Sequence, residues 1–326
     1  MIVTKALRKS FPSRGRRAEP VDAVRGIDLT VGRGEIFGVL GPNGAGKTTT
    51  LRMLATLVRP DGGEATVAGA DLRAEAAEVR RRIGYVAQGG GTADAVSARE
   101  ELVLQARMYG VAKAEAKARA QEAIDAFDLG GFADRHCRTY SGGQRRRLDL
   151  ALGVIHRPRL LFLDEPTVGL DPQSRSQVWA EVRRLRERGM TVLLTTHYLD
   201  EADSLCDRIG IVDRGTVVAE GTPEQLKKEI AGDAVLLSVR PQESAAAHRS
   251  LSGLDWVSGV EAVAGEDDDA GGAAGLRLYV DSAAAALPRL MRVLQEAGVE
   301  PLLVQLRRPS LDDVFLARTG RALDQA

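Results

Sequence analysis

The sequence of 326 residues contains little cysteine and little histidine. Its two cysteines, Cys137 and Cys206, stand far apart and outside any C-x-x-C pair, and only four histidines are present. Disulfide frameworks and zinc sites need such residues in closely spaced groups. The composition therefore argues against both kinds of site and fits a reducing cytosol.

An excess of charge of one sign is also absent, because 45 Lys and Arg balance 45 Asp and Glu. Without a net field, neither nucleic acid nor an acidic membrane surface is the expected partner. We accordingly interpret the arginine runs at 80–82 and 145–147 as solvated helix faces rather than binding patches. No apolar run approaches the roughly 18 residues of a membrane span, and the N-terminus lacks a charged-then-apolar signal region. If membranes are involved, another chain supplies the membrane part.

Glycine is abundant, and one glycine-rich stretch carries a chemical signature. It reads Gly41-Pro42-Asn43-Gly44-Ala45-Gly46-Lys47-Thr48 and fits the G-x-x-x-x-G-K-[ST] pattern of a phosphate-binding loop. An apolar run at 36–40 precedes it and a helical pattern at 49–57 follows, which is the strand, loop and helix context that the motif requires. Glycine allows backbone N–H groups to approach a phosphate closely. Lys47 would reach the β and γ phosphates, and the Thr48 hydroxyl would ligate Mg²⁺.

Two further apolar strands end in polar residues. The run 160–163 is followed by Asp164 and Glu165, and the run 192–196 by His197. Adjacent carboxylates at a buried strand end need cationic partners, which Mg²⁺ and a nucleotide-bound water supply. Asp164 would then hold the metal, Glu165 would polarise the attacking water, and His197 would bond a γ-phosphate or that water. The alternatives are solvated acids and a structural histidine.

Three weaker signals accompany them. Ser141 is a plausible N-cap, and Gly142 and Gly143 behind it would open a second pocket of backbone donors. Gln88 ends the apolar strand 83–87, where a glutamine is by itself usually a loop residue. Phe11 either stacks on an adenine ring or packs in the ordinary way.

Taken together, the order and spacing of these residues resemble the ATP-binding subunit of an ABC transporter over residues 1 to about 230. The resemblance implies bound ATP and Mg²⁺ and assigns a role to each motif. Phe11 takes the adenine-stacking place, residues 41–48 form the Walker A loop, and Thr49 is a further nucleotide-binding residue. Gln88 is the Q-loop glutamine and a magnesium ligand with Thr48 and Asp164. The signature consists of Ser141, Gly142, Gly143 and Gln144. The Walker B strand is 160–164, and Glu165 after it is the catalytic glutamate. Asp171 belongs to the D-loop, and His197 is the switch histidine. Lys47 and Gln88 join Glu165 and His197 as catalytic residues.

The resemblance also implies partners. Two subunits would stack head to tail, so that Ser141 and Gly143 of one subunit contact an ATP held by Lys47 of the other. A separately encoded membrane permease would complete the transporter and hold this cytoplasmic subunit at the inner face of the membrane. Departures from the pattern are Tyr140 in place of leucine, Val168 in place of serine, and the glycines at 89–91, which predict unusual flexibility after Gln88.

After residue 230 the pattern changes. Alternating apolar residues predict strands at 235–239 and 276–280, helical spacing covers 287–294, and Gly298 is expected to end that helix. With a helix at 243–251 and strands at 256–263 and 302–306, the order is β-α-β-β-α-β, as in ferredoxin-like domains. Residues 265–275 read as an exposed hairpin loop, and Ser310 begins a capping pattern before a short helix.

The predicted fold is thus an α/β P-loop NTPase domain of the ABC type, with a mixed sheet and a helical subdomain, followed by a small α+β ferredoxin-like domain. The expected boundaries are 1–230, with the helical subdomain at about 89–158, then 231–308 and a helical tail at 309–326. The extension resembles the daunorubicin-resistance class of drug-export ATPases. We therefore expect an ATP hydrolase that powers export of a hydrophobic drug or antibiotic, with no nucleic acid and no zinc.

Two alternatives stay open from the sequence. One is a soluble ABC ATPase acting on nucleic acid or ribosomes, which neutral charge and the absence of a long coiled-coil insertion disfavour. The other is a regulatory ATP-binding module without turnover, which the presence of Asp164, Glu165 and His197 opposes.

Overall fold

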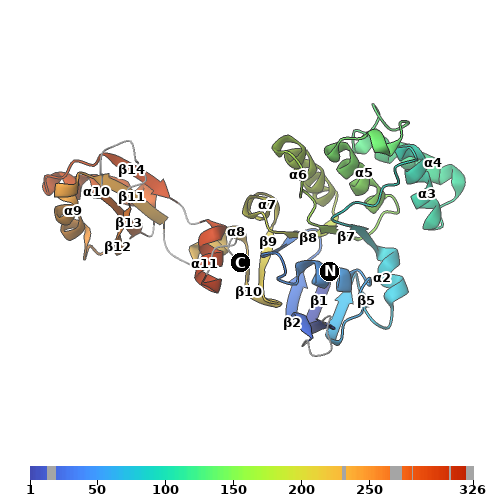
Figure 1. Cartoon of the computed structure of the whole chain (residues 1–326), viewed down its shortest axis with the longest axis horizontal. Coiled ribbons are helices and arrows are strands. Elements are labelled where there is room, and N and C mark those ends of the chain that lie inside the picture. The colour runs from blue at the N-terminus through green and yellow to red at the C-terminus, as the bar shows by residue number, and fades with distance from the viewer. Residues whose placement is uncertain (13–19, 230–232, 265–273, 281, 308–309, 321–326) are drawn as a thin grey trace. The chain divides into compact units, whose positions relative to one another are not determined.

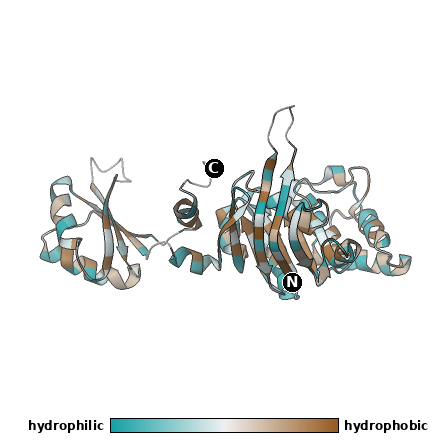
Figure 2. Cartoon of the chain, turned by 90° about the horizontal axis from the view of Figure 1, so that it is seen from below, coloured by the Kyte–Doolittle hydropathy of each residue, from teal (hydrophilic) through white to brown (hydrophobic). Residues whose placement is uncertain are grey.

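The computed structural model of the chain describes residues 1–12, 20–229, 233–264, 274–280, 282–307 and 310–320. The chain divides into two compact units, residues 1–223 and residues 224–322. In both units hydrophobic residues run along the central strands (Figure 2). None of the helices in the described ranges combines the length and the apolar character that a membrane crossing demands.

The first unit contains an antiparallel sheet and a larger, mainly parallel sheet (Figure 1). The antiparallel sheet has the order β2-β1-β4-β5. Its strands are β1 (Ile2–Phe11), β2 (Val21–Val31), β4 (Gly62–Val67) and β5 (Ala70–Asp71). The sequence predicts the first two strands at 2–7 and 27–31, but both extend well beyond these bounds, because they pair with each other as far as Phe11 and Val21. The sequence also predicts a basic loop at 13–17, which lies outside the described residues.

The larger sheet has the order β10-β9-β3-β8-β7-β6. Its strands are β3 (Ile36–Leu40), β6 (Ile83–Val86), β7 (Leu160–Asp164), β8 (Thr191–Thr196), β9 (Arg208–Asp213) and β10 (Thr216–Gly221). All neighbours are parallel except β9 and β10. The register sets Leu40 beside Thr196 and Asp164 beside Thr195. Since parallel strands end at one edge of a sheet, the segments after β3, β6, β7 and β8 all leave the sheet at the same edge.

Helices complete the first unit. They are α1 (Lys47–Leu54), α2 (Ala76–Arg82), α3 (Ala98–Met108), α4 (Lys113–Ala126), α5 (Gly142–Val154), α6 (Pro172–Glu187) and α7 (Leu199–Leu205), with a 3₁₀ turn at Cys137–Thr139. One hydrophobic core joins the antiparallel sheet, helix α1 and strands of the parallel sheet; it includes Ile27, Phe37, Leu51, Phe162 and Leu193. Helices α3, α4 and α5 lie together in the helical part of this unit (Figure 1).

One interpretation of the arginine runs is wrong. Arg146 in α5 is only 5% exposed, so the run 145–147 is not simply a solvated face. The side chain shares a buried stripe of the helix with Gly143, Leu150 and Gly153. In the other run, Arg81 is exposed and pairs with Glu78, as expected of a surface residue.

The second unit contains a four-stranded antiparallel sheet of order β12-β13-β11-β14. Its elements are α8 (Pro223–Lys228), β11 (Asp233–Val239), a 3₁₀ turn at Pro241–Glu243, α9 (Ser244–Leu251), β12 (Val257–Ala264), β13 (Ala274–Val280), α10 (Ala283–Glu296), β14 (Leu303–Arg307) and α11 (Leu311–Thr319). From β11 to β14 this is the predicted β-α-β-β-α-β order. Helices α9 and α10 supply Leu251, Leu290 and Leu294 to a core with Leu237 and Leu278.

Details of this unit refine the expectations. The capping pattern at Ser310 is confirmed, because its hydroxyl accepts from the Asp313 N–H and the Asp313 carboxylate accepts from the Ser310 N–H. Gly298 has a φ of +67° just after α10, which fits a helix stop at glycine. The hairpin loop expected at 265–275 lies outside the described residues except for Ala274 and Gly275, which belong to β13.

Candidate functional site

The glycine-rich loop forms the turn from β3 into α1, as its sequence predicts. Gly44 and Gly46 have φ values of +81° and +100°, a region that side chains disfavour. A Cβ at Gly41 would lie 2.2 Å from the Val212 carbonyl oxygen, and one at Gly46 would lie 2.3 Å from the Ala23 carbonyl oxygen. Glycine is therefore required at 41 for packing, and at 46 for both packing and backbone conformation.

Lys47 begins helix α1 and is only 4% exposed. Its ammonium donates to the carbonyl oxygens of Gly41 at 2.7 Å and Pro42 at 2.9 Å. It also lies 3.4 Å from Glu165 Oε1. Burial lowers the pKa of Lys47, while the charges of Glu165 and Asp164 oppose that shift. The loop thus holds a buried cation beside a buried carboxylate.

Asp164 ends β7 with its side chain fully buried. The carboxylate accepts hydrogen bonds from Thr48 Oγ1 at 2.9 Å and Thr195 Oγ1 at 2.8 Å, and a longer one from the Tyr85 hydroxyl at 3.4 Å. All three donors are neutral. A buried carboxylate bonded to a hydroxyl is an oxygen-rich pair of the kind that Mg²⁺ prefers. Thr48 and Asp164 therefore fit a magnesium ion shared with a phosphate.

Glu165 follows Asp164 with an unusual backbone, because its φ of +44° lies in the left-handed region. Its N–H donates to Thr195 Oγ1 at 3.0 Å, which helps to hold this conformation. The side chain is 6% exposed and accepts from Gln88 Nε2 at 2.7 Å. His197 Nδ1 lies 3.4 Å from Glu165 Oε1 without the geometry of a hydrogen bond. Lys47, Gln88 and His197 thus converge on one carboxylate.

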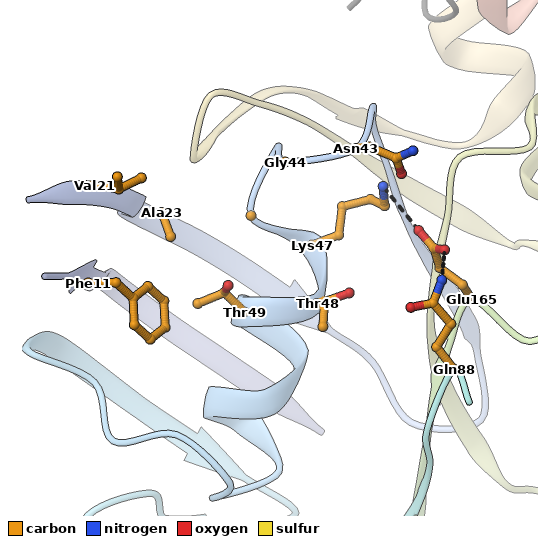
Figure 3. Close-up of a pocket in the computed structure, with 11 residues that line it drawn as sticks. Phe11, Val21, Ala23, Asn43, Gly44, Lys47, Thr48, Thr49, Gln88 and Glu165 are labelled. Carbon is orange, nitrogen blue, oxygen red and sulfur yellow. Dashed lines mark hydrogen bonds and ion pairs between the residues drawn. The ribbon is translucent and has the colours of Figure 1, made fainter. Parts of the chain in front are cut away.

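A cavity of about 360 Å³ opens in front of these residues. Its lining consists of Phe11, Val21, Ala23, Asn43, Gly44, Gly46, Lys47, Thr48, Thr49, Gln88 and Glu165. Phe11, Val21 and Ala23 stand at one end, while Lys47, Gln88 and Glu165 stand at the other (Figure 3). Phe11 is 38% exposed, so it is not an ordinary core residue. An apolar end and a charged end suit a molecule with a planar ring and a phosphate chain.

The remaining loop residues stand behind the cavity. Gly41, Pro42 and Ala45 are buried, and the carbonyl oxygens of the first two hold Lys47. The Ala45 carbonyl accepts from the Gly215 N–H at 3.0 Å. Their place in the site is to support the loop.

The second glycine motif is a helix start, as expected. Ser141 Oγ accepts from the Gln144 N–H, and the Gln144 side chain accepts from the Ser141 N–H, which forms a capping box at α5. A Cβ at Gly143 would lie 2.6 Å from Ser174 Oγ, and one at Gly142 would lie 3.4 Å from a methyl group of Leu170. The starts of α5 and α6 are therefore tightly packed.

Asp171 belongs to this second region. It is the N-cap of α6 and accepts from the Ser174 N–H at 2.9 Å and from Ser174 Oγ at 2.6 Å. These bonds lower the pKa of Asp171. Neither Asp171 nor the segment 141–144 belongs to the lining of the Lys47 cavity. The predicted site residues thus form two groups within one chain.

Sequence reasoning missed Tyr85 and Thr195, which bond Asp164, and Arg146, whose guanidinium donates to backbone carbonyls beside the site. The polar end of β8 was a usable signal for Thr195. For Arg146 the signal was its spacing of three residues from Gly143 and four from Leu150, which puts all three on one helix face.

The structure also accounts for two departures from the family pattern. Tyr140 is buried and its hydroxyl donates to the Phe132 carbonyl, and the Gly91 N–H donates to the Asp149 carboxylate.

Comparisons with known proteins agree with this geometry. The family model for the ABC transporter ATP-binding domain matches residues 24–168, and a model for the C-terminal domain of DrrA1-3-like ATP-binding proteins matches residues 221–319. The daunorubicin/doxorubicin resistance ATP-binding protein DrrA of Streptomyces peucetius is 47% identical over 93% of this chain and 89% of its own length. The linearmycin resistance ATP-binding protein LnrL of Bacillus subtilis is 39% identical, covering 92% of this chain and 94% of the relative.

Among solved structures, a dimeric ATP-binding cassette in a post-hydrolysis state with bound ADP and Pi has a TM-score of 0.62 and 27% identity. The match covers 68% of this chain and 98% of that chain. These relatives are resistance proteins and ATP-binding cassettes, and they give no support to the alternative of an ATPase acting on nucleic acid. The chain belongs to the ATP-binding, ATP-hydrolysing subunits of ABC transporters, in the group that shares the DrrA-like C-terminal domain.

Proposed function

We propose that the cavity binds ATP with its adenine against Phe11 and its phosphates in the loop 41–48. The apolar and charged ends of the cavity support this orientation. Asn43, Gly44 and Thr49 line the intervening wall, and α1 adds the unpaired N–H groups of its first turn. Lys47 would exchange its bonds to the Gly41 and Pro42 carbonyls for bonds to the phosphates.

Thr48 and Asp164 would hold Mg²⁺, with Gln88 as a further ligand. When bound, the ion would neutralise phosphate charge and polarise a phosphoryl oxygen. The Thr48 hydroxyl and the Asp164 carboxylate already bond each other at 2.9 Å, which supports a shared site. Gln88 is bonded to Glu165 in this structure, so its amide would have to turn to serve the ion.

Glu165 would act as the general base. A phosphate that draws Lys47 away removes the cation 3.4 Å from Glu165 and leaves the carboxylate free to accept a proton from water. His197, at the same distance from Glu165, would bond the γ-phosphate or the same water. The convergence of Lys47, Gln88 and His197 on Glu165 is the observation that carries the proposal.

We further propose a head-to-tail homodimer. Ser141, Gly142, Gly143 and Gln144 form a helix start away from the Lys47 cavity, and Asp171 lies beside them. The backbone donors at this helix start have no phosphate-binding loop beside them in the same chain. They would gain a phosphate partner if the segment 141–144 contacted ATP bound by a second copy. A dimeric relative with bound ADP and Pi supports this arrangement.

The subunit would power a separately encoded membrane permease that exports a hydrophobic drug or antibiotic. The resistance proteins that it matches over nearly their whole lengths support this role. It would then work in the cytoplasm at the inner face of the membrane. We retain the domain boundaries 1–230, 231–308 and 309–326 as part of the proposal, with the helical subdomain at about 89–158.

Substitution Glu165→Gln tests the proposal. The variant keeps the size of the side chain but removes the base, so we expect ATP affinity to be retained and phosphate release to fall by about 100-fold or more. With hydrolysis blocked, ATP and Mg²⁺ should convert the protein to a dimer in size-exclusion chromatography with light scattering, and EDTA should reverse the change.

Glu122→Gln is the matched control, because Glu122 is exposed in α4 and pairs with Arg157 at the surface. It should turn over ATP at the wild-type rate. Undiminished turnover in Glu165→Gln would remove Glu165 from the role of base, and a monomer under all conditions would refute the shared ATP sites.

A further inference from the structure

Helix α5 carries the buried guanidinium of Arg146, which reaches two loops of the candidate site. One loop contains Gln88 and the other contains Glu165. Arg146 Nε donates to the Pro166 carbonyl at 2.6 Å, Nη1 to the Ala87 carbonyl at 2.8 Å and Nη2 to the Asp164 carbonyl at 3.3 Å. Ala87 immediately precedes Gln88, and Asp164 and Pro166 stand on either side of Glu165. One side chain thus fixes the peptides that position both Gln88 and Glu165.

Asp149, one turn further along α5, completes the attachment of the Gln88 segment. Its carboxylate accepts from the Gly91 N–H at 3.2 Å and lies 3.8 Å from Arg146 Nη1. Helix α5 therefore holds this segment at two points, the Ala87 carbonyl and the Gly91 N–H. Of the glycines after Gln88, which predict flexibility in the sequence, Gly91 is held in the structure by Asp149.

The contacts depend on the shape of arginine. A planar guanidinium presents several N–H groups in fixed directions, and three of them meet three carbonyl oxygens here. Burial lowers the pKa of Arg146, and Asp149, Glu201 and Asp164 oppose that shift. A lysine ammonium would preserve the charge but could not meet three carbonyls in this fork geometry.

Helix α5 begins with the Ser141 capping box. Close by, Gly143 packs so tightly against Ser174 that a Cβ at position 143 would lie 2.6 Å from Ser174 Oγ. Arg146 lies one turn after Gly143 on the same face of the helix. A displacement of this helix start would therefore move the guanidinium and the three carbonyls bonded to it. The helix connects the two groups of site residues that the cavity lining keeps apart.

We propose that Arg146 is a positioning residue that ties the placement of Gln88 and Glu165 to helix α5, and so to the Ser141–Gln144 segment. The inference rests on the proposed function, in which that segment meets ATP bound by a second copy. Occupation of the partner's site then sets the geometry of Gln88 and Glu165 in the first copy. Hydrolysis in either site depends through Arg146 on ATP in the other.

The test uses the full chain with Arg146→Lys, Arg146→Gln and the control Arg147→Lys. Arg147 lies on the same helix, but its guanidinium donates to Asp128 and reaches neither loop. We expect both Arg146 variants to lower kcat by about 10- to 100-fold while the affinity for a non-hydrolysable ATP analogue changes by less than about 2-fold. Cooperativity of turnover with ATP concentration should also decrease, whereas Arg147→Lys should behave as the wild type.

A double-mutant cycle with Ser141→Ala tests the connection itself. If Arg146 transmits the effect of the helix start, the combined variant should lose clearly less activity than the product of the two separate losses. A simple product of losses would overturn the connection. Unchanged kcat in both Arg146 variants would overturn the positioning role, and so would failure of both variants to fold, since that would make Arg146 a purely structural residue.

The two proposals fail in different ways. Wild-type protein without ATP turnover, or with full turnover as a monomer, would refute the proposed function. Active, dimerising wild type together with unaffected Arg146 variants would refute only the role of Arg146.

Discussion

At the scale of single residues, the central feature of the site is the buried ammonium of Lys47 and the groups that it contacts. Lys47 donates to two carbonyls of its own loop and faces Glu165 at 3.4 Å. The loop carbonyls and the carboxylate together stabilise a charge that burial would otherwise disfavour. A phosphate offers stronger charge-assisted bonds to the same group. In the proposed function, Lys47 would therefore respond to the nucleotide and control Glu165 at the same time.

Substitution Lys47→Ala should weaken ATP binding by about 10- to 100-fold, because it removes charge-assisted hydrogen bonds to the phosphates. Equilibrium binding of a fluorescent ATP analogue measures the effect. Lys117→Ala, at an exposed position of α4, is the control and should bind as the wild type. Unchanged affinity in Lys47→Ala would contradict the assignment of residues 41–48 as the phosphate loop.

At the scale of elements, three helices of the described residues begin with a capping box, α3 at Ser97, α5 and α11, and the last two allow a comparison of stability with function. Capping boxes start α5 at Ser141 and α11 at Ser310. Both serine hydroxyls satisfy a backbone N–H of the first helical turn. Helix α5 carries Arg146, whose guanidinium reaches backbone carbonyls of the candidate site. Since Ser141 and Ser310 form the same cap but only Ser141 belongs to the proposed ATP site, the two residues can be compared directly.

Ser141→Ala and Ser310→Ala should each reduce the stability of the unit that contains them by about 1 kcal/mol, because each removes an N-cap. Only Ser141→Ala should also reduce ATP turnover. Denaturant unfolding and phosphate release, measured on both variants, separate the two effects. Similar turnover in the two variants would argue that Ser141 does no more than cap its helix.

His156, just after α5, gives this part of the molecule a pH dependence. Its Nε2 lies 2.8 Å from the Ile83 carbonyl, which assigns the proton of the neutral ring to Nε2, and Nδ1 is buried without a partner. The ring stacks on Tyr109 with centroids 3.7 Å apart. Burial lowers the pKa of His156 from its usual value of 6.5. The folded state therefore favours the uncharged ring.

Since the unfolded chain takes up this proton more readily, stability is fully present above the unfolded pKa and is lost as the pH falls below it. We expect the unfolding midpoint of residues 1–223, the unit that contains His156, to decrease in the wild type between about pH 7 and pH 5. His156→Gln should show a shallower decrease, and His248→Gln, at an exposed position of α9, should not. Identical pH profiles for all three proteins would refute this role of His156.

At the scale of the whole molecule, the chain consists of two units with separate cores. The entire lining of the Lys47 cavity, from Phe11 to Glu165, belongs to residues 1–223. A ligand bound in this cavity would therefore contact residues of the first unit, 1–223. A ligand stabilises only the cooperative unit to which it binds in the folded state.

Calorimetry of the full chain should show two transitions, of which ATP with Mg²⁺ shifts one. At a ligand concentration 100 times Kd, the first unit should gain about 2.7 kcal/mol. The shift should disappear in Lys47→Ala, which identifies the transition of residues 1–223. A single transition that moves as a whole would contradict the independence of the units.

Much of this architecture could be predicted from local sequence. The loop 41–48, the strand 160–164, the N-cap at Ser141 and the capping box at Ser310 depend on neighbouring residues in the chain, and the structure has them where the patterns indicate. The β-α-β-β-α-β order after residue 230 follows from periodicity for the same reason. Strand ends were less accurate, because pairing of β1 with β2 extends both strands beyond their apolar runs.

Arg146 illustrates what local pattern misses. A triple-arginine run resembles a solvated face, yet the middle residue is buried because three carbonyls from distant loops satisfy its guanidinium. Those loops are 18 to 59 residues away in the sequence. No single stretch of the chain contains that information.

The sequence by itself determined the chemistry of this protein: a phosphate loop, a pair of carboxylates at a strand end and a capped glycine turn, all set by residue types at short spacing. Only the tertiary structure decided how these groups act on one another. The parallel register of the large sheet brings Lys47, Gln88, Glu165 and His197 to one edge, and helix α5 joins that edge to Ser141 through a buried arginine. The physical reason is that hydrogen bonds and ion pairs act across a few ångströms of space, whatever the distance along the chain.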